Sequence, residues 1–416
     1  MSAAPDQKAT APKLKRTLGL GLLVLYGLGV TIGAGIYVLV GITAGRAGIY
    51  APTAFLVAAV VMAFSAASFA EFAGRFPVSA GEATYVREGF RSEKMALIVG
   101  LVVIIEATIA GATIGLGSVG YLHSFIQLPA WLLIALVIIL MGLIAAVGTL
   151  QSVAFAAILT VIEVAGLLAI IAGGFFGDHD IFARLPTVVP SSFEWSVWSG
   201  VLGASILAFF AFIGFEDMVN VAEETKQPRR VLPIAIFITL GLVTVFYFLV
   251  SAIAVLSVPV AELAQSQAPL GLVFGAVTSL PSSAIIMIAI VATLNGVIIQ
   301  IIMASRVIYG LADKGNLPRF LGPRFLGQVH PRTRTPVVAT ALVTLIMLMF
   351  AIGFDLEFLA EFTSRMTLVV FALVNLALVW LKLGGRAPSH EHFSVPIWVP
   401  VIGFVLSLAA LLPAPV

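Results

Sequence analysis

The sequence lacks cysteine altogether and has few charged residues. With no cysteine among 416 residues, disulfides, thiolate metal sites and cysteine catalysis are excluded. Charged residues make up 10% of the chain and hydrophobic residues 61%, whereas soluble domains carry about 25% charged residues. The formal net charge of +2 is too small to indicate nucleic acid binding. We therefore expect a chain that lies mostly within a lipid bilayer.

Signatures of enzymes and of nucleotide-driven pumps are also lacking. The chain contains no nucleophile–base set and no phosphate-binding loop, so neither an enzyme nor a primary pump is predicted. The five histidines fall at the ends of apolar runs or in loops, without the spacing of metal ligands, so no metal and no other cofactor is expected. The N-terminus, MSAAPDQKATAPKLKRT, is polar and has no cleavage site, and the apolar run after it is too long for a signal peptide.

Long apolar runs are abundant instead. A helix of about 20 apolar residues crosses the hydrocarbon core of a bilayer. We predict an all-α integral membrane protein with one membrane domain over residues 1–416. Its eleven predicted spans are 18–44, 51–74, 95–124, 129–148, 151–176, 197–222, 231–257, 282–310, 336–353, 356–381 and 396–413. The stretch 262–280 is shorter and less continuous, and we expect an extracellular loop with a short helix there.

The distribution of basic residues tests this count. If the N-terminus is cytoplasmic, all but three of the 22 Lys and Arg residues fall on the cytoplasmic side. The exceptions are Arg46 and Arg184, which fall outside, and Arg365, in or near the tenth span. A missed span would invert every later loop. The excess of Lys and Arg on one side therefore predicts a multi-pass protein of the plasma or inner cell membrane with a cytoplasmic N-terminus.

Two of the predicted spans carry an interruption. The first contains GLGVTIGAGIY, with four glycines between Gly27 and Tyr37. The sixth contains FFAFIGFEDMVNVAEE, in which Gly214 precedes two acidic residues. One reading is close helix packing at small residues; the other is a pair of unwound segments.

Interrupted helices in corresponding positions of two halves indicate the binding site of a transporter. The first and sixth spans correspond if each half has five spans. Because five is odd, the second half then enters the membrane in the opposite orientation. We therefore expect an inverted repeat of residues 18–176 and 197–381 with discontinuous helices 1 and 6, and residues 396–413 as an extra span.

Five stretches occur in a characteristic order along the chain. They are GLGVTIGAGIYVLVG, SFAEFAGRFPVSAG, AEETKQPRRVLPIAI, ASRVIYGLADKGNLP and TRTPVVA. In this order they resemble the amino acid–polyamine–organocation (APC) superfamily, of leucine-transporter-like fold, over nearly the whole chain. The resemblance implies a secondary transporter of amino acids that works by alternating access. Two departures stand out, because members usually have twelve spans and because the stretch SAGEATYV differs from the family pattern.

The two interruptions also predict a substrate from their own chemistry. Free N–H groups of residues 31–35, at the positive end of the outer half-helix, suit a carboxylate, and glycine lets a ligand touch the backbone. Carbonyl groups at the end of the sixth span's outer half suit an ammonium group. One anion site and one cation site predict an α-amino acid. The predicted substrate-binding residues are Thr31, Ile32, Gly33, Ala34, Gly35, Phe209, Ala211, Phe212, Gly214, Glu106 and Gln300.

Some of these residues have a plainer alternative. Phe212 either resembles the family's aromatic gate over the substrate or packs in the core. Gln300 and Asn295 either line the site or hydrogen-bond between helices. At the inner end of the sixth span we expect a gate network among acidic and basic side chains, namely Asp217, Glu223, Glu224, Lys226, Arg229 and Arg230.

Glu106 lies within the third predicted span and Glu163 within the fifth, and neither span holds Lys or Arg. Intramembrane charges mark ion or substrate pathways by default, although a protonated carboxyl group that bonds a neighbouring helix is the alternative. We predict that Glu163 couples proton movement to transport, and that Glu106 either shares this role or faces the substrate side chain. Some relatives in the family carry a lysine in the fifth span where this chain has Glu163.

Sodium coupling is not expected. The inner part of the eighth span, IIQIIMASR, offers one hydroxyl, that of Ser305, for a site with convergent oxygen ligands. The predicted function is thus sodium-independent amino acid transport across the bilayer, proton-coupled or by exchange. The alternative is a sensor or partner-dependent subunit with the same fold that does not transport.

Overall fold

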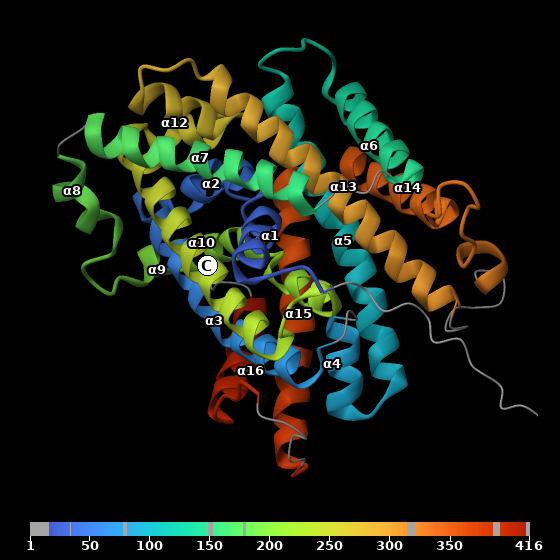
Figure 1. Ribbon diagram of the computed structural model, residues 1–416. Coiled ribbons are helices and arrows are strands. Elements are labelled where there is room, and N and C mark those ends of the chain that lie inside the picture. The colour runs from blue at the N-terminus through green and yellow to red at the C-terminus, as the bar shows by residue number, and fades with distance from the viewer. Residues whose placement is uncertain are drawn as a thin grey trace, which may run out of the picture.

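Each of the eleven predicted spans coincides with helix in the computed structural model (Figure 1). The structure describes residues 16–33, 35–77, 81–148, 153–177, 180–313, 322–385 and 392–412, and these contain helices and no strand. The spanning helices are α1 (Leu20–Ile32) with α2 (Gly35–Ala47), α3 (Ala51–Arg75), α5 (Glu93–Leu122), α6 (Ala130–Val147), α7 (Val153–Gly177), α9 (Trp195–Phe212) with η3 (Phe215–Glu224), α10 (Pro228–Ser257), α13 (Ser283–Asp313), α14 (Val337–Gly353), α15 (Leu356–Leu383) and α16 (Trp398–Leu411).

The first and sixth spans are each broken into two pieces. The first is α-helical on both sides of its break, between Ile32 and Gly35. The sixth changes type at its break, because α9 is an α-helix and η3, which starts at Phe215, is a 3₁₀ helix. Both predicted interruptions are confirmed.

Short helices lie in the loops between the spans. They are η1 (Gly48–Tyr50), α4 (Gly81–Phe90), α8 (Ile181–Arg184), η2 (Leu185–Val188), α11 (Val260–Gln265), α12 (Pro269–Val277) and the π-helical turn η4 (Gly322–Leu326). The predicted loop 262–280 holds parts of two helices rather than one. Its helix α11 packs against α2, where a Cβ at Gly41 would lie 2.5 Å from the carbonyl oxygen of Leu263.

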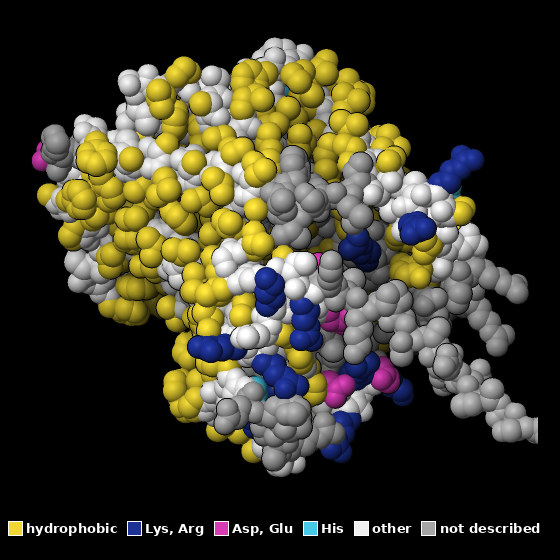
Figure 2. All heavy atoms as spheres, in the orientation of Figure 1, with side chains coloured by type: hydrophobic (Ala, Val, Ile, Leu, Met, Phe, Trp, Pro, Cys, Tyr) yellow, Lys and Arg dark blue, Asp and Glu magenta, His cyan; other side chains and the backbone are white. Residues whose placement is uncertain are grey.

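The surface is that of a multi-pass membrane protein. Large apolar side chains stand exposed along the spans, including Leu143 of α6 and Ile158 of α7, which are 60% and 58% exposed. We call the two ends of the bundle the Arg46 end, where α2 meets α3, and the Arg75 end, where α3 finishes. In Figure 2, apolar side chains cover the upper half of the face shown, and Lys and Arg side chains gather on the lower half, toward α4 and α16.

Contacts between the spans occur in exchanged pairs. Helix α1 packs against α10, and its counterpart α9 packs against α3, the counterpart of α10. The same exchange relates α1 against α7 to α9 against α15. A five-plus-five repeat produces this pattern, and it places the two broken spans beside each other in the middle of the bundle.

Candidate functional site

The two breaks approach each other through glycine. A Cβ at Gly35, the first residue of α2, would overlap the Cα of Ala211 in α9. A Cβ at Gly214, in the second break, would lie 2.9 Å from the carbonyl oxygen of Val30 in α1. Each break therefore carries a glycine where the backbone of the other span comes closest, and neither site has room for a side chain.

The four glycines between Gly27 and Tyr37 have different surroundings. A Cβ at Gly27 would lie 2.5 Å from Met218 Sδ, and one at Gly29 would overlap the hydroxyl of Thr160. Close helix packing therefore accounts for these two and for Gly35. Gly33 differs, because a Cβ there would meet only carbonyl oxygens of its own helix, at 3.4 and 3.5 Å. The glycine whose added Cβ would make only ordinary contacts lies in the break itself.

A small cavity of about 30 Å³ lies beside the breaks. It has space for a water molecule or two rather than an amino acid. Its lining comes from four spans, namely Gly29, Val30, Thr31, Gly33, Gly35, Ala110, Ile114, Phe210, Ile213, Gly296, Ile299 and Gln300. Of the predicted site residues, Thr31, Gly33, Gly35 and Gln300 line it.

Other predicted residues lie elsewhere. Ile32, Phe209 and Phe212 are buried but do not line the cavity, and Ala34 lies outside the described residues. The ring of Phe212 packs edge-on against Tyr247, with centroids 5.0 Å apart. This placement favours core packing over a gate for Phe212. The aromatic ring on the cavity belongs to Phe210.

Sequence reasoning missed the lining from α5. Ala110 and Ile114 are four residues apart, so they lie on one face of the helix, and Glu106 lies one turn before them on the same face. The available signal was this spacing, since positions one and two turns after Glu106 share its helix face. Only Glu106 was predicted from this span, and it lies beside the cavity rather than in its lining.

Tyr247 of α10 connects the two breaks. Its hydroxyl lies 2.8 Å from the carbonyl oxygen of Thr31 and 2.7 Å from that of Ala211. Both carbonyls belong to the last turn of a half-helix, where the next N–H groups of the helix are missing. Tyr247 is fully buried and was not among the predicted residues, because nothing in its own span marks it.

The helix N-termini at the two breaks differ in whether a side chain accepts hydrogen bonds from their backbone N–H groups. In the second break, the backbone N–H of Gly214 donates to the carboxylate of Glu216, at 2.9 Å. In the first, no described side chain hydrogen-bonds to the N–H of Gly35, Ile36 or Tyr37 at the start of α2. The positive end of α2 is therefore the one with capacity for an external anion.

Acidic side chains gather on the Arg75 side of the second break. Glu106, Glu216 and Asp217 are buried and lie close enough to Glu82 of α4 for electrostatic interaction. Glu106 accepts a hydrogen bond from Thr367 Oγ1 at 3.1 Å. Burial raises the pKa of Glu82, in the loop helix α4, to about 7. Four acidic side chains thus lie together on the Arg75 side of the second break.

Glu163 lies on α7 next to the first break. Its side chain is 2% exposed, and among the described residues neither carboxylate oxygen has a hydrogen-bond partner. The hydroxyl of Tyr37, in α2, donates to the backbone carbonyl of Glu163 at 3.0 Å. A buried carboxyl group without a partner is costly unless it is protonated or meets a ligand in another conformation.

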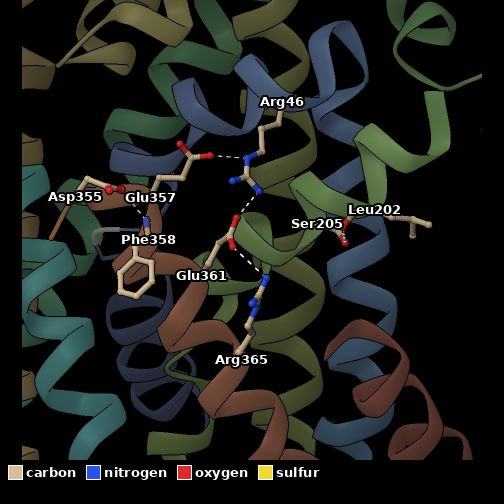
Figure 3. Close-up of polar contacts among 8 residues, drawn as sticks. All are labelled: Arg46, Leu202, Ser205, Asp355, Glu357, Phe358, Glu361 and Arg365. Atoms are coloured by element: carbon tan, nitrogen blue, oxygen red, sulfur yellow. Dashed lines mark hydrogen bonds and ion pairs between the residues drawn. The ribbon is translucent and has the colours of Figure 1, made fainter. Parts of the chain in front are cut away.

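Ion pairs close the Arg46 end. Figure 3 shows Arg46 of α2 reaching Glu357 and Glu361 of α15, with Arg365 on the other side of Glu361. The Arg46 Nε–Glu357 Oε1 distance is 2.5 Å, and Arg365 Nη2 lies 3.2 Å from Glu361. The chain of charges joins the outer half of the first span to the tenth.

Backbone hydrogen bonds close the Arg75 end. The N–H groups of Thr17 and Leu18 donate to the carbonyl of Glu224, at 2.9 and 3.0 Å, and that of Lys226 donates to the carbonyl of Leu18 at 2.8 Å. These bonds join the start of the first span to the end of the sixth. The contacts found here are main-chain pairs that the sequence did not indicate, and the side-chain gate network stays a prediction.

A second closure at the Arg75 end is a buried ionic cluster. Glu71 of α3 accepts from Arg75 at 2.5 Å, from Lys382 of α15 at 2.7 Å and from the backbone N–H of Val395 at 2.8 Å. The Glu71 side chain is fully buried. Contacts between the spans thus occur at both ends of the bundle.

Broken helices that meet beside a cavity in an apolar helix bundle are features of a transporter. A family model described as amino acid permease matches residues 19–416. The chain belongs to this family. Its fold and its function are therefore those of a permease and not of an enzyme.

Individual relatives cover the same region. The chain is 31% identical to the branched-chain amino acid permease BcaP of Bacillus subtilis, over 89% of this chain and 81% of that one. It is 31% identical to the vacuolar cationic amino acid transporter 4 of Arabidopsis thaliana, over 89% of this chain but 64% of the relative. It is also 26% identical to the methylthioribose transporter of B. subtilis, over 96% and 87% of the two chains. The permease thus spans less than two thirds of the plant relative's length.

Proposed function

We propose that this permease is a secondary active transporter that moves an α-amino acid across the membrane by alternating access. The observation that carries the proposal is the difference between the two breaks. The start of α2 offers backbone N–H groups beside the open Gly33, and the ends of α1 and α9 offer carbonyls that Tyr247 reaches. N–H groups bind a carboxylate and carbonyls bind an ammonium, so together they fit a zwitterion.

The exchanged helix pairs support an inverted repeat of residues 18–176 and 197–381 around this site. The distribution of Lys and Arg supports a cytoplasmic N-terminus in the plasma or inner membrane, which makes the Arg46 end extracellular. In such a carrier the Arg46 ion pairs open toward the outside, and the Thr17–Glu224 pairing opens toward the cytoplasm.

The substrate side chain points toward the cavity between α5, α9 and α13, which must widen from about 30 Å³ to hold it. Its walls are mostly apolar, with the amide of Gln300 as a polar group. Glu106, one turn away on α5, favours substrates with a polar or cationic side chain. Two relatives are named for branched-chain and for cationic amino acids, so a first experiment compares these two substrate classes.

Transport is sodium-independent and is coupled to protons or to exchange. The hydroxyl of Ser305 donates to the carbonyl of Ile302 in its own helix at 3.0 Å and is engaged there. Glu163, buried without a hydrogen-bond partner among the described residues, is the group for proton coupling, with Glu106 second. Uptake that stays unchanged when choline replaces sodium supports this, and uptake that stops contradicts it.

The test of the proposed function is uptake into proteoliposomes of labelled L-valine and labelled L-lysine. Competition by the standard amino acids identifies the substrate class. Methyl esters and N-acetyl derivatives of the best competitor should compete poorly, because each removes one charge of the zwitterion. Binding without uptake or exchange would favour the alternative, a non-transporting sensor or partner-dependent subunit of the same fold.

A further inference from the structure

Tyr247 holds the carbonyls that the proposed substrate needs. Its single phenolic hydrogen faces two acceptors, the oxygens of Thr31 and Ala211, at 2.8 and 2.7 Å. One acceptor ends the inner half of the first span and the other ends the outer half of the sixth. A positively polarised hydrogen between two helix C-termini occupies the same electrostatic position as a substrate ammonium group.

The position of the Tyr247 hydroxyl is fixed by its ring. The ring packs edge-on against Phe212 at 5.0 Å and against Phe55 of α3 at 5.7 Å between centroids. The side chain is fully buried. Removal of the hydroxyl alone therefore leaves the packing of the ring in place.

The two carbonyls have no other donor in the described part of the chain. Among backbone bonds outside the helices, none ends on the oxygen of Thr31 or Ala211. In a bilayer, backbone groups without partners are expensive. An empty carrier must satisfy these carbonyls while both of its ends are closed, and in this structure Tyr247 does so.

We propose that the Tyr247 hydroxyl takes the place of the substrate ammonium in the empty carrier and yields the two carbonyls to it on binding. This inference rests on the proposed binding of an α-amino acid at the breaks. Its consequence is kinetic. The loaded carrier passes through the occluded state with the ammonium on the carbonyls, and the empty carrier passes through it with Tyr247 on them.

Net uptake and exchange depend differently on this substitution. Net uptake requires the empty carrier to return through its occluded state. Exchange does not require an empty carrier to return, because the carrier holds a substrate in both directions of the transport cycle. Tyr247 is thus a positioning residue that permits net transport by the permease.

The experiment compares the parent with Tyr247→Phe in proteoliposomes, with labelled L-valine and labelled L-lysine as probes. Net uptake is measured in vesicles without internal amino acid, and exchange in vesicles preloaded with the same unlabelled amino acid. We expect net uptake to fall at least tenfold in the variant while exchange stays within about twofold of the parent. A tenfold change corresponds to about 1.4 kcal/mol in the barrier.

Tyr121→Phe is the matched control. It removes a buried phenolic hydroxyl that donates to the backbone carbonyl of Tyr37 at 2.5 Å, away from both carbonyls in question. The ratio of exchange to net uptake should stay at the parental value. If Tyr121→Phe raised this ratio as Tyr247→Phe does, loss of any buried hydroxyl would have the effect, and the inference would be overturned.

A thermal measurement adds a second readout. A saturating concentration of the transported amino acid should raise the unfolding temperature of Tyr247→Phe more than that of the parent, because the ammonium supplies the missing donor. The inference is overturned if Tyr247→Phe loses net uptake and exchange equally, so that the ratio of exchange to net uptake is unchanged. A variant that does not fold overturns it as well. Absence of both exchange and binding in the parent overturns instead the proposed function beneath it.

Discussion

The two helix breaks differ in composition as much as in geometry. Neither α1 nor α2 carries an acidic residue, and Gly33 in the first break lines the cavity. The second break turns through Gly214 at φ +124° and continues as a 3₁₀ helix with acidic residues in its first turn. One of them, Glu216, satisfies the backbone N–H of Gly214. The proposed anion site and the proposed cation site thus lie at interruptions that differ in both composition and helix type.

The largest effect is expected at the first break. Gly33→Leu places a branched side chain into the cavity and against the N–H groups at the start of α2, so binding and transport should be lost while the fold persists. Gly33→Ala should be milder, because its Cβ meets only two carbonyl oxygens at 3.4 Å or more. Binding of labelled L-valine and L-lysine, together with size-exclusion profiles, measures both.

Gly241→Leu is the control for an added leucine. Gly241 is exposed on α10, and a Cβ added there would have no atom within 4 Å, so the change should leave transport at the parental rate. If Gly33→Leu transports as well as this control does, the anion site lies elsewhere and the contrast between the breaks fails.

At the second break the expected effect is on stability. Gly214→Ala forces an L-residue into a conformation that costs about 2 kcal/mol, and its Cβ would lie 2.9 Å from the carbonyl oxygen of Val30. Thermal unfolding in detergent should shift to lower temperature. The substrate affinity of the protein that remains folded should change less than in Gly33→Leu. A loss of binding at parental stability would mean that both breaks act as direct ligand sites.

The fold was predictable because its signals are long and compositional. Apolar runs such as 129–148 and 356–381 match α6 and α15 within a few residues, since a span needs about 20 apolar residues. The breaks were predictable because glycine beside acidic residues is a poor lipid-facing helix. The second helix in the loop 262–280 was missed because α11 and α12 are short and are held by contacts with other elements, among them Gly41 of α2.

The site was predictable only in part. Thr31, Gly33 and Gln300 stand out as polar or flexible positions within apolar spans, and they line the cavity. Phe210 and Phe212 cannot be distinguished by composition, because two positions on a helix face different directions and only packing against Tyr247 decides between them. Tyr247 itself depends on a contact between residues 216 positions apart, which no local pattern contains.

A smaller and more specific effect is expected from Glu163→Gln, beside the first break. If Glu163 takes up and releases the coupled proton, the glutamine variant should show a flat pH profile of uptake and a weak response to an imposed pH gradient, while substrate binding persists. Glu106→Gln is the comparison, because its carboxylate already accepts a bond from Thr367. A parental pH profile in Glu163→Gln would assign that residue a structural role and make Glu106 the next candidate.

The smallest effect is expected at the far end of α2, where the first break connects to the Arg46 end. The ion pairs of Arg46 with Glu357 and Glu361 are partly exposed, with 38% of the Arg46 side chain accessible. Exposed pairs contribute about 1 kcal/mol at most. Arg46→Gln should therefore favour opening of this end by about fivefold.

The absence of cysteine makes this opening measurable. A single cysteine introduced by Ala110→Cys on the cavity wall reports access from outside when a membrane-impermeant maleimide is added to intact cells. Labelling should be about fivefold faster with Arg46→Gln, and added salt should speed labelling of the Arg46 protein more than that of the variant, because salt screens the pairs. Arg184→Gln removes the same charge at the same end, where Arg184 donates to the carbonyl of Leu256 in α10, and should leave the rate unchanged. Equal rates for all three proteins would mean that α2 and α15 separate without resistance from these charges, and that closure of this end depends on apolar packing alone.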